Sequence, residues 1–249
     1  MVGMLLWKTP QAGKREKAVT VKERSILHVR FMCAEILRGP KTPEAVLRRR
    51  IATAGKRLRK LGASQLVLPE EFPYVEQLKK WELHPVSRLS LRRAIAADWV
   101  RWSLEARGEA TTGARIAVSA QRLTGEVVRT VTELSLRHRY VLLDVPHGGE
   151  ELCRQLRREY GVSLLLGPSK EQMEGAEVLV LFDTREDCQS PAALRLYEET
   201  VPLPPLLLPP ALEEKLPSGS DRGQLLTTLR ENGALRPGQI VVGGAILTK

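Results

Sequence analysis

Four apolar blocks recur along one stretch of the chain: RIAVS at residues 115–119, YVLLDV at 140–145, VSLLL at 162–166 and EVLVLF at 177–182. Each block is continuous rather than alternating, which is typical of a strand that is buried on both faces. This stretch therefore predicts four central, mostly parallel β-strands.

Two amphipathic stretches, at 124–138 and 149–160, lie between the first three blocks. Their apolar residues recur at spacings of three and four, so each stretch predicts a helix with one apolar stripe to pack on a sheet. The result is a βαβαβ unit. The ten residues at 167–176 are short for a helical crossover and leave two possibilities open. The last strand is either reached through a single helical turn or runs antiparallel.

The order of these elements resembles that of Rossmann-like dinucleotide-binding domains. In that family an acid at the end of the second strand binds the ribose, and Asp144 stands in the corresponding place. The resemblance implies a ligand beyond the carboxyl ends of the strands, where helix N-termini present free N–H groups. The loop after the first strand reads SAQRLTG at 119–125, and only Gly125 matches a GxGxxG glycine.

The candidate ligand-binding residues lie on the loops that follow the first two strands. Residues 144–149 combine an acid, a histidine and two glycines that can open a helix, while the loop at 119–124 offers groups for a phosphate. The set consists of Ser119, Arg122, Thr124, Asp144, His147, Gly148 and Gly149. A plainer interpretation stays open, in which the glycines shape a tight turn, His147 is merely exposed and Thr124 only caps a helix.

The basic residues are concentrated at the N-terminus. Residues 1–62 hold 16 Lys and Arg and 4 Glu, a net charge of +12, so the remaining residues sum to −2. We expect a flexible arm over 1–22, a helix over 23–38 and a second helix over 42–61. The candidate nucleic-acid-binding residues form one face of the second helix: Arg48, Arg49, Arg50, Lys56, Arg57 and Lys60. Such a face either aids solubility or binds nucleic acid or another polyanion.

The composition, 43% apolar and 27% charged among 249 residues, is that of an ordinary globular protein. No apolar run approaches the roughly 18 residues of a membrane helix, and the N-terminus lacks a secretory cleavage pattern. Three widely spaced cysteines without a CxxC pair indicate reduced thiols. We therefore expect a cytoplasmic protein without a zinc site.

We expect three segments within one α/β domain: a basic arm with two helices at 1–62, a Rossmann-like core at 63–187, and a proline-rich strap, helix and terminal strand at 188–249. Strand and helix patterns run without a break from Gln65 into the first apolar block, which favours one doubly wound, continuous sheet. In such a sheet Glu70 and Glu71 would share an edge with Asp144. One helix is expected over residues 89–106.

The leading functional hypothesis is an α/β protein that binds a nucleotide or a phosphorylated small molecule at the strand ends. The alternatives are a non-catalytic scaffold and a nucleic-acid-associated protein. No GxSxG, HExxH, P-loop or carboxylate dyad is present, so the sequence neither names a cofactor nor decides whether a reaction is catalysed. His28, His84 and His138 are isolated in sequence, and we expect them at the surface or at its boundary.

Overall fold

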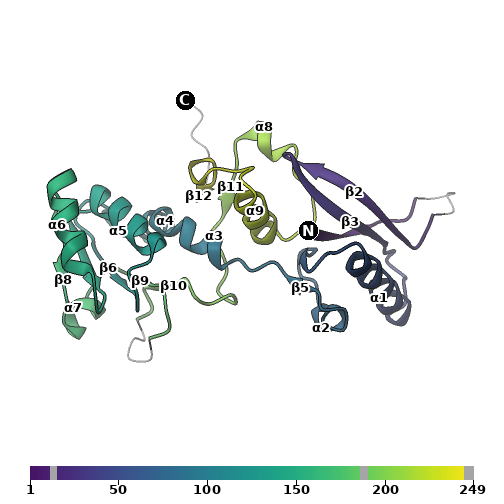
Figure 1. Cartoon of the computed structure of the whole chain (residues 1–249), viewed down its shortest axis with the longest axis horizontal. Coiled ribbons are helices and arrows are strands. Elements are labelled where there is room, and N and C mark those ends of the chain that lie inside the picture. The colour runs from purple at the N-terminus through teal and green to yellow at the C-terminus, as the bar shows by residue number, and fades with distance from the viewer. Residues whose placement is uncertain (12–15, 186–189, 244–249) are drawn as a thin grey trace. The chain divides into compact units, whose positions relative to one another are not determined.

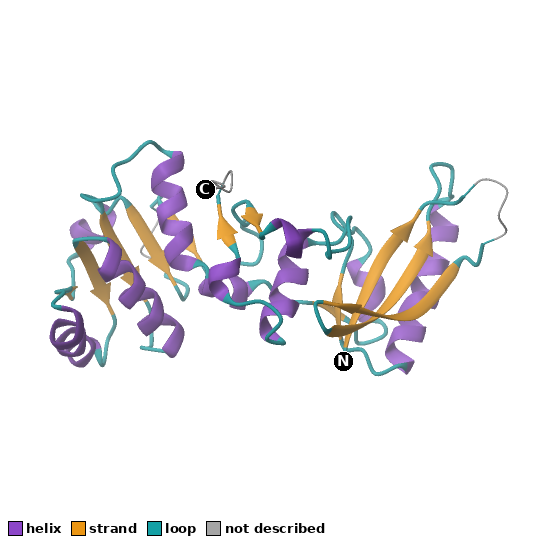
Figure 2. Ribbon diagram, turned by 90° about the horizontal axis from the view of Figure 1, so that it is seen from above, coloured by secondary structure: helices purple, strands orange, loops and turns teal. Residues whose placement is uncertain are grey.

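The computed structural model describes residues 1–11, 16–185 and 190–243. By its internal contacts the chain divides into two compact units: unit 1 comprises Met1–Arg88 and Leu208–Gln239, and unit 2 comprises Leu89–Leu207 and the segment that begins at Ile240. Each unit holds one five-stranded sheet (Figure 2). Along the described ranges, no helix is long and apolar enough to cross a membrane. The three segments expected from the sequence stay a prediction, and Cys188 lies outside the described residues.

The sheet of unit 2 is the one that the apolar blocks predict. Its strands are β6 (Arg115–Ser119), β7 (Tyr140–Asp144), β8 (Leu165–Leu166), β9 (Val178–Leu181) and β10 (Ala193–Arg195). They are parallel and lie in the order β10-β9-β6-β7-β8. Counted from β6 this order is 5-4-1-2-3, the arrangement of a Rossmann-like sheet, in which the direction of winding reverses between the first and fourth strands. The α/β, mostly parallel fold class is confirmed.

Three helices connect these strands. Helix α5 (Gly125–Arg137) joins β6 to β7, α6 (Gly149–Tyr160) joins β7 to β8, and α7 (Lys170–Glu174) joins β8 to β9. The short α7 resolves the choice that the sequence left open, because β9 runs parallel to β6. The expected cap at Thr124 is also confirmed, because the Thr124 side chain accepts the N–H of Val127 and caps α5. Gly161 ends α6 with a left-handed φ of 69°.

The two faces of this sheet are covered differently. Met173 of α7 packs in a buried cluster with Ala117, Leu142 and Leu179. Because successive side chains of a strand point to opposite faces, Ile116 and its alternate neighbours point away from α7. Figure 1 shows α5 and α6 on the other side of the strands from α7. One face therefore carries the long helices α5 and α6, whereas the helix on the other face has five residues.

Unit 2 also contains two helices before the sheet, where one was expected: α3 (Leu89–Ala94) and α4 (Ala96–Ala106), interrupted at Ile95. Arg92 is fully buried here and donates to the carbonyl oxygens of Glu199 and Val201. After β10, strand β11 (Leu206–Leu207) pairs antiparallel with β12 (Val241–Val242). The proline-rich segment thus contributes only to a two-stranded sheet, as its missing N–H donors require, and the terminal strand is confirmed.

The sheet of unit 1 has the order β2-β3-β1-β4-β5. Strand β2 is antiparallel to β3, and the other pairs are parallel. The elements of this unit are β1 (Val2–Lys8), β2 (Val19–Ile26), β3 (Val29–Leu37), α1 (Glu44–Lys60), β4 (Gln65–Val67), α2 (Val75–Lys79), β5 (His84–Pro85), α8 (Pro210–Glu213), α9 (Arg222–Glu231) and the 3-10 turn Pro237–Gln239. Helix α1 packs Ile51 and Leu58 against Leu5 and Ile36 of the sheet.

The helix expected over residues 23–38 is wrong. The part of the chain that precedes α1 forms strands, so the expected basic helical segment is wrong there as well. Residues 23–38 belong mainly to the β2–β3 hairpin, and β1 lies in the segment that we expected to be a loose arm. Strand β3 is buried on both faces, with Phe31 and Cys33 on one side and Ala34 and Ile36 on the other. A strand of this kind shows no alternation, so its apolar spacing also fits a helix.

The single continuous sheet is also wrong. Strands β4 and β5 pair with β1 and with each other, not with β6. The pattern from Gln65 onward is therefore the end of one sheet followed by the start of another. Glu70 and Glu71 belong to unit 1, so the edge that we expected them to share with Asp144 does not exist.

Candidate functional site

A polar crevice lies at the carboxyl ends of β6, β7 and β9. The register places Ser119 of β6 beside Asp144 of β7 and beside Leu181 of β9. Neighbouring strands β6 and β9 continue toward opposite edges of the sheet, and their loops therefore separate at this point. In open α/β sheets, ligands bind at such a switch point.

A hydrogen-bonded cluster forms the floor of this crevice. The Ser119 hydroxyl donates to Oδ2 of Asp144 at 3.1 Å. The Arg185 guanidinium donates to the Ser119 hydroxyl at 2.9 Å and forms an ion pair with the same Asp144 oxygen. The side chains of Arg185 and Asp144 remain 28% and 34% exposed, so a ligand can reach both.

The crevice encloses about 260 Å³. Three loops contribute to its lining, which comprises Ser119, Ala120, Gln121, Asp144, Pro146, Asp183, Thr184 and Arg185. Asp183 accepts the backbone N–H of Gln121 at 2.8 Å and thereby joins the loops after β6 and β9. The described lining thus presents two carboxylates and one guanidinium, a set that offers both acceptors and donors to a ligand.

His147, Gly148 and Gly149 lie on a different hollow. It encloses about 570 Å³ at the start of α6, and Glu150 and Arg154 also line it. Pro146 borders both hollows. The sequence therefore grouped residues that the structure places at two neighbouring sites: Ser119 and Asp144 at one, and His147 with the two glycines at the other.

Local packing accounts for the two glycines. Gly148 has a left-handed φ of 81°, and a Cβ atom there would lie 3.1 Å from a side-chain carbon of Leu123. A Cβ atom at Gly149 would lie 3.1 Å from a side-chain carbon of Val145. Close approach of the β6–α5 and β7–α6 loops thus requires glycine at position 148 whether or not a ligand binds.

Arg122 and Thr124 line neither hollow in the described part of the chain. Both are exposed, and Thr124 is occupied as the cap of α5. Conversely, the set of candidate residues did not include Gln121, Asp183 and Arg185, although the segments 119–124 and 183–185 were both expected at the carboxyl ends of the strands. The available signal was positional: Asp183 and Arg185 follow an apolar block directly, as Asp144 ends another.

The basic face of α1 divides into two sets of residues. Arg50 donates to the carbonyl oxygen of Leu37, and Arg57 donates to that of Val19 at 3.0 Å. These two hydrogen bonds join α1 to the strands of the sheet, although Arg57 remains exposed. Arg48 is exposed and pairs with Glu44, a carboxylate that the sequence interpretation had not assigned to this face.

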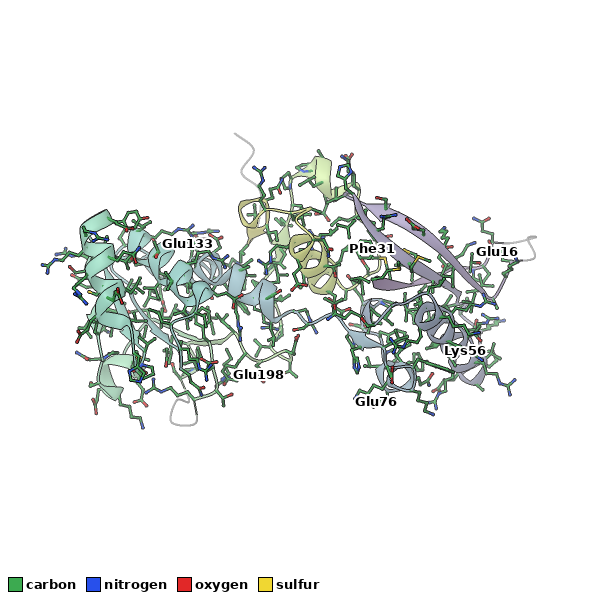
Figure 3. The ribbon with its side chains drawn as sticks, in the orientation of Figure 1. Glu16, Phe31, Lys56, Glu76, Glu133 and Glu198 are labelled. Carbon is green, nitrogen blue, oxygen red and sulfur yellow. The ribbon has the colours of Figure 1, made fainter. Side chains whose placement is uncertain are left out.

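The other three residues of that face, Arg49, Lys56 and Lys60, are exposed. In the regions that the structure describes, none of the three forms an ion pair. They are separated by seven and four residues along the helix and therefore lie on one side of it. Figure 3 labels Lys56 on α1. We call these three residues the basic stripe.

One histidine is placed differently from the expectation. His138 is 4% exposed, whereas His28 and His84 are exposed. Its Nδ1 lies 2.9 Å from the carbonyl oxygen of Thr111, an acceptor, so Nδ1 carries the proton. Its Nε2 is buried without a hydrogen-bond partner in the described structure. Burial lowers the pKa of His138 below its usual 6.5, although the Thr111 carbonyl opposes the shift.

A metal site finds no support at the crevice. In the described ranges, no group of three or more His, Cys, Asp or Glu side chains could hold a metal ion. Asp144 and Asp183 are already engaged by Arg185 and by the Gln121 N–H, respectively. The chemistry that the crevice offers is hydrogen bonding and ion pairing.

No protein-family model matches the chain, and no curated protein matches it. Solved structures with a coarse likeness include L-tryptophan dehydrogenase from Nostoc punctiforme, at 14% identity and a TM-score of 0.28 over 60% of this chain and 44% of that one. The catalytic subunit of M. jannaschii aspartate transcarbamoylase gives 14% and 0.28 over 59% and 51%. Ornithine carbamoyltransferase from Pyrococcus furiosus gives 14% and 0.27 over 72% and 58%.

The chain thus spans about half the length of these solved proteins. At TM-scores this low the likeness carries no argument about what the chain binds.

Proposed function

We propose that unit 2 binds a nucleotide or another phosphorylated sugar in the crevice at the ends of β6, β7 and β9. The observation that supports this proposal is the cluster of Ser119, Asp144 and Arg185, which lies at the switch point of a Rossmann-like sheet and is open to solvent.

Asp144 and Arg185 are suited to the sugar and to the phosphate of such a ligand, respectively. Asp144 can accept hydrogen bonds from sugar hydroxyls, which is the role that the Rossmann resemblance implies for an acid at this position. Arg185 can donate two parallel hydrogen bonds to a phosphate. Asp144 and Arg185 pair with each other in the crevice, and a sugar phosphate would supply a hydroxyl partner for the first and a phosphate partner for the second.

The size of the crevice favours one nucleoside or sugar phosphate over a dinucleotide. Its 260 Å³ lies just below the range of about 300–1,000 Å³ that is usual for small-molecule sites. The glycines that let a pyrophosphate approach the backbone are absent, and Gln121 and Arg122 stand in their place. Two carboxylates in the described lining also disfavour inorganic phosphate alone.

Calorimetric titration with ribose 5-phosphate, AMP and inorganic phosphate tests the proposal. We expect Arg185→Gln to weaken sugar phosphate binding roughly tenfold to a hundredfold, because a charged hydrogen-bond donor is lost. Asp144→Asn should weaken ribose 5-phosphate but not inorganic phosphate, since it replaces a charged hydroxyl acceptor with a weaker amide oxygen and releases Arg185. Arg157→Gln, an exposed arginine of α6, is the matched control.

The proposal fails if no ligand of this panel binds the wild-type protein at millimolar concentration, or if both crevice variants bind as the control does. The scaffold hypothesis required an apolar, filled cleft with Arg122 packed into it. The open polar crevice and the exposed Arg122 count against that alternative.

A second proposal concerns unit 1, whose basic stripe of Arg49, Lys56 and Lys60 can contact successive phosphates of nucleic acid. Replacing all three by glutamine should reduce the slope of log affinity against log salt by about 2.7 for duplex DNA, at about 0.9 per phosphate contact. The control replaces Arg122, Arg157 and Arg158 of unit 2, which changes the net charge equally. Equal effects of the two triple variants, or no binding at about 50 mM salt, would exclude a specific role for the stripe.

A further inference from the structure

A third hollow of unit 2 lies near the amino ends of β6 and β7, at the opposite end of the strands from the crevice. It encloses about 370 Å³, and its lining includes Arg115, Arg139, Tyr140, Leu142, Leu165 and Gln172. None of these residues lines the crevice. The hollow therefore cannot be an extension of the proposed nucleotide site.

The floor of this hollow is a part of the sheet that α7 leaves open. Tyr140 shares a face with Leu142, which packs against α7, because the two are two residues apart in β7. The register adds Leu165 beside Leu142. Tyr140 and Leu165 are 47% and 44% exposed, although apolar residues of a sheet face in an α/β domain are usually covered.

Two guanidinium groups border this apolar floor. The Arg139 guanidinium lies 5.4 Å from the centre of the Tyr140 ring, and in the described structure it has no carboxylate within ion-pair distance. Arg115 lies beside Tyr140 in the register, and its guanidinium lies 3.5 Å from Glu177. Arg139 is thus the cation that remains available to a ligand.

We propose that this hollow binds a small organic anion with an apolar body, of the class of aryl- or acyl-carboxylates. The apolar body covers Tyr140, Leu142 and Leu165, and the carboxylate takes a bidentate position on Arg139. The volume lies within the range of about 300–1,000 Å³ that is usual for small-molecule sites.

Calorimetric titration with 4-phenylbutyrate tests the charge and the apolar body separately. The neutral 4-phenylbutan-1-ol keeps the apolar body, and it should bind at least about tenfold more weakly. Arg139→Gln should remove that difference while leaving the alcohol unaffected. Arg122→Gln, an exposed arginine that does not line the hollow, should leave both affinities unchanged.

Leu165→Asn tests the floor, because it should weaken the acid and the alcohol alike. Absence of 4-phenylbutyrate binding at 10 mM, or equal binding of acid and alcohol by the wild type, would overturn the proposal. So would a dimer in sedimentation velocity that Leu165→Asn dissociates, since a second copy would then occupy the hollow. Ribose 5-phosphate binding should persist in Arg139→Gln, which separates this site from the crevice.

Discussion

The two sheets of this protein have five strands each, yet they differ in how they are built and in how readily the sequence reveals them. The sheet of unit 2 is parallel throughout, and its strands alternate with amphipathic helices. The sheet of unit 1 has an antiparallel hairpin at one edge, in which β2 and β3 follow each other with no helix between them. A parallel sheet can be predicted from the sequence mainly because its strands alternate with helices. The apolar character of any one strand contributes less to that prediction.

The largest expected effects test whether each sheet has its own core. Leu179 of β9 and Ile51 of α1 are both fully buried, one in each unit. Leu179→Ala and Ile51→Ala should each reduce the free energy of unfolding by about 2–5 kcal/mol, because each leaves a cavity.

Hydrogen exchange locates the loss in each variant. Leu179→Ala should deprotect β6, β7 and β9 while leaving the amides of β1 and β3 protected, and Ile51→Ala should do the reverse. Uniform deprotection of both sheets by either variant would show that the units unfold as one cooperative structure.

The stability of unit 2 should depend on pH, because His138 is buried there. The pKa of His138 is lowered in the folded protein, so between that pKa and the usual 6.5 the unfolded chain binds a proton that the native protein does not. Stability should therefore fall as the pH is lowered through 6.5. Well above pH 6.5, His138 should not make stability depend on pH. Thermal unfolding between pH 7.5 and 5 should show a smaller decline in His138→Gln than in the wild type. His147→Gln, at an exposed histidine, should follow the wild type.

Particular residues show how far sequence alone could lead. The first, second and fourth apolar blocks and the cap at Thr124 are local signals, and the structure confirms the strands and the cap that they predict. The third block gives only the two-residue edge strand β8, and Leu165 is 44% exposed, so the expectation of a central strand buried on both faces is wrong there. The hairpin of unit 1 was missed because β3 packs on both faces, and long-range burial erases the alternation that marks a strand. The crevice was found only in part for a related reason. Asp144 and Arg185 are 41 residues apart, and only the pairing of β7, β6 and β9 brings them together.

The turn between β2 and β3 offers a site for a stabilising substitution. Its two-residue turn consists of Leu27 and His28, with φ values of 45° and 71°. Leucine rarely adopts a left-handed φ, whereas histidine adopts it more often, and a turn of this type strongly prefers Asn-Gly. The double substitution Leu27→Asn, His28→Gly should raise the free energy of unfolding of unit 1 by about 1 kcal/mol in denaturant titrations. The order Leu27→Gly, His28→Asn should stabilise less, and a loss of stability in both would show that these side chains contribute packing that outweighs the turn.

The smallest expected effect decides between the two roles offered for Thr124, as a ligand-binding residue and as a cap. Its hydroxyl accepts the N–H of Val127, and the residue lines neither of the hollows at the strand ends. Thr124→Ala should therefore cost about 1 kcal/mol of stability, the usual effect of losing a cap, and Thr124→Ser should restore most of it. If Thr124 is only a cap, ribose 5-phosphate affinity measured well below the melting temperature should be the same in all three proteins. A tenfold loss of affinity in Thr124→Ala that serine recovers would instead extend the nucleotide site from the crevice to the start of α5, where the free N–H groups of the helix could meet a phosphate.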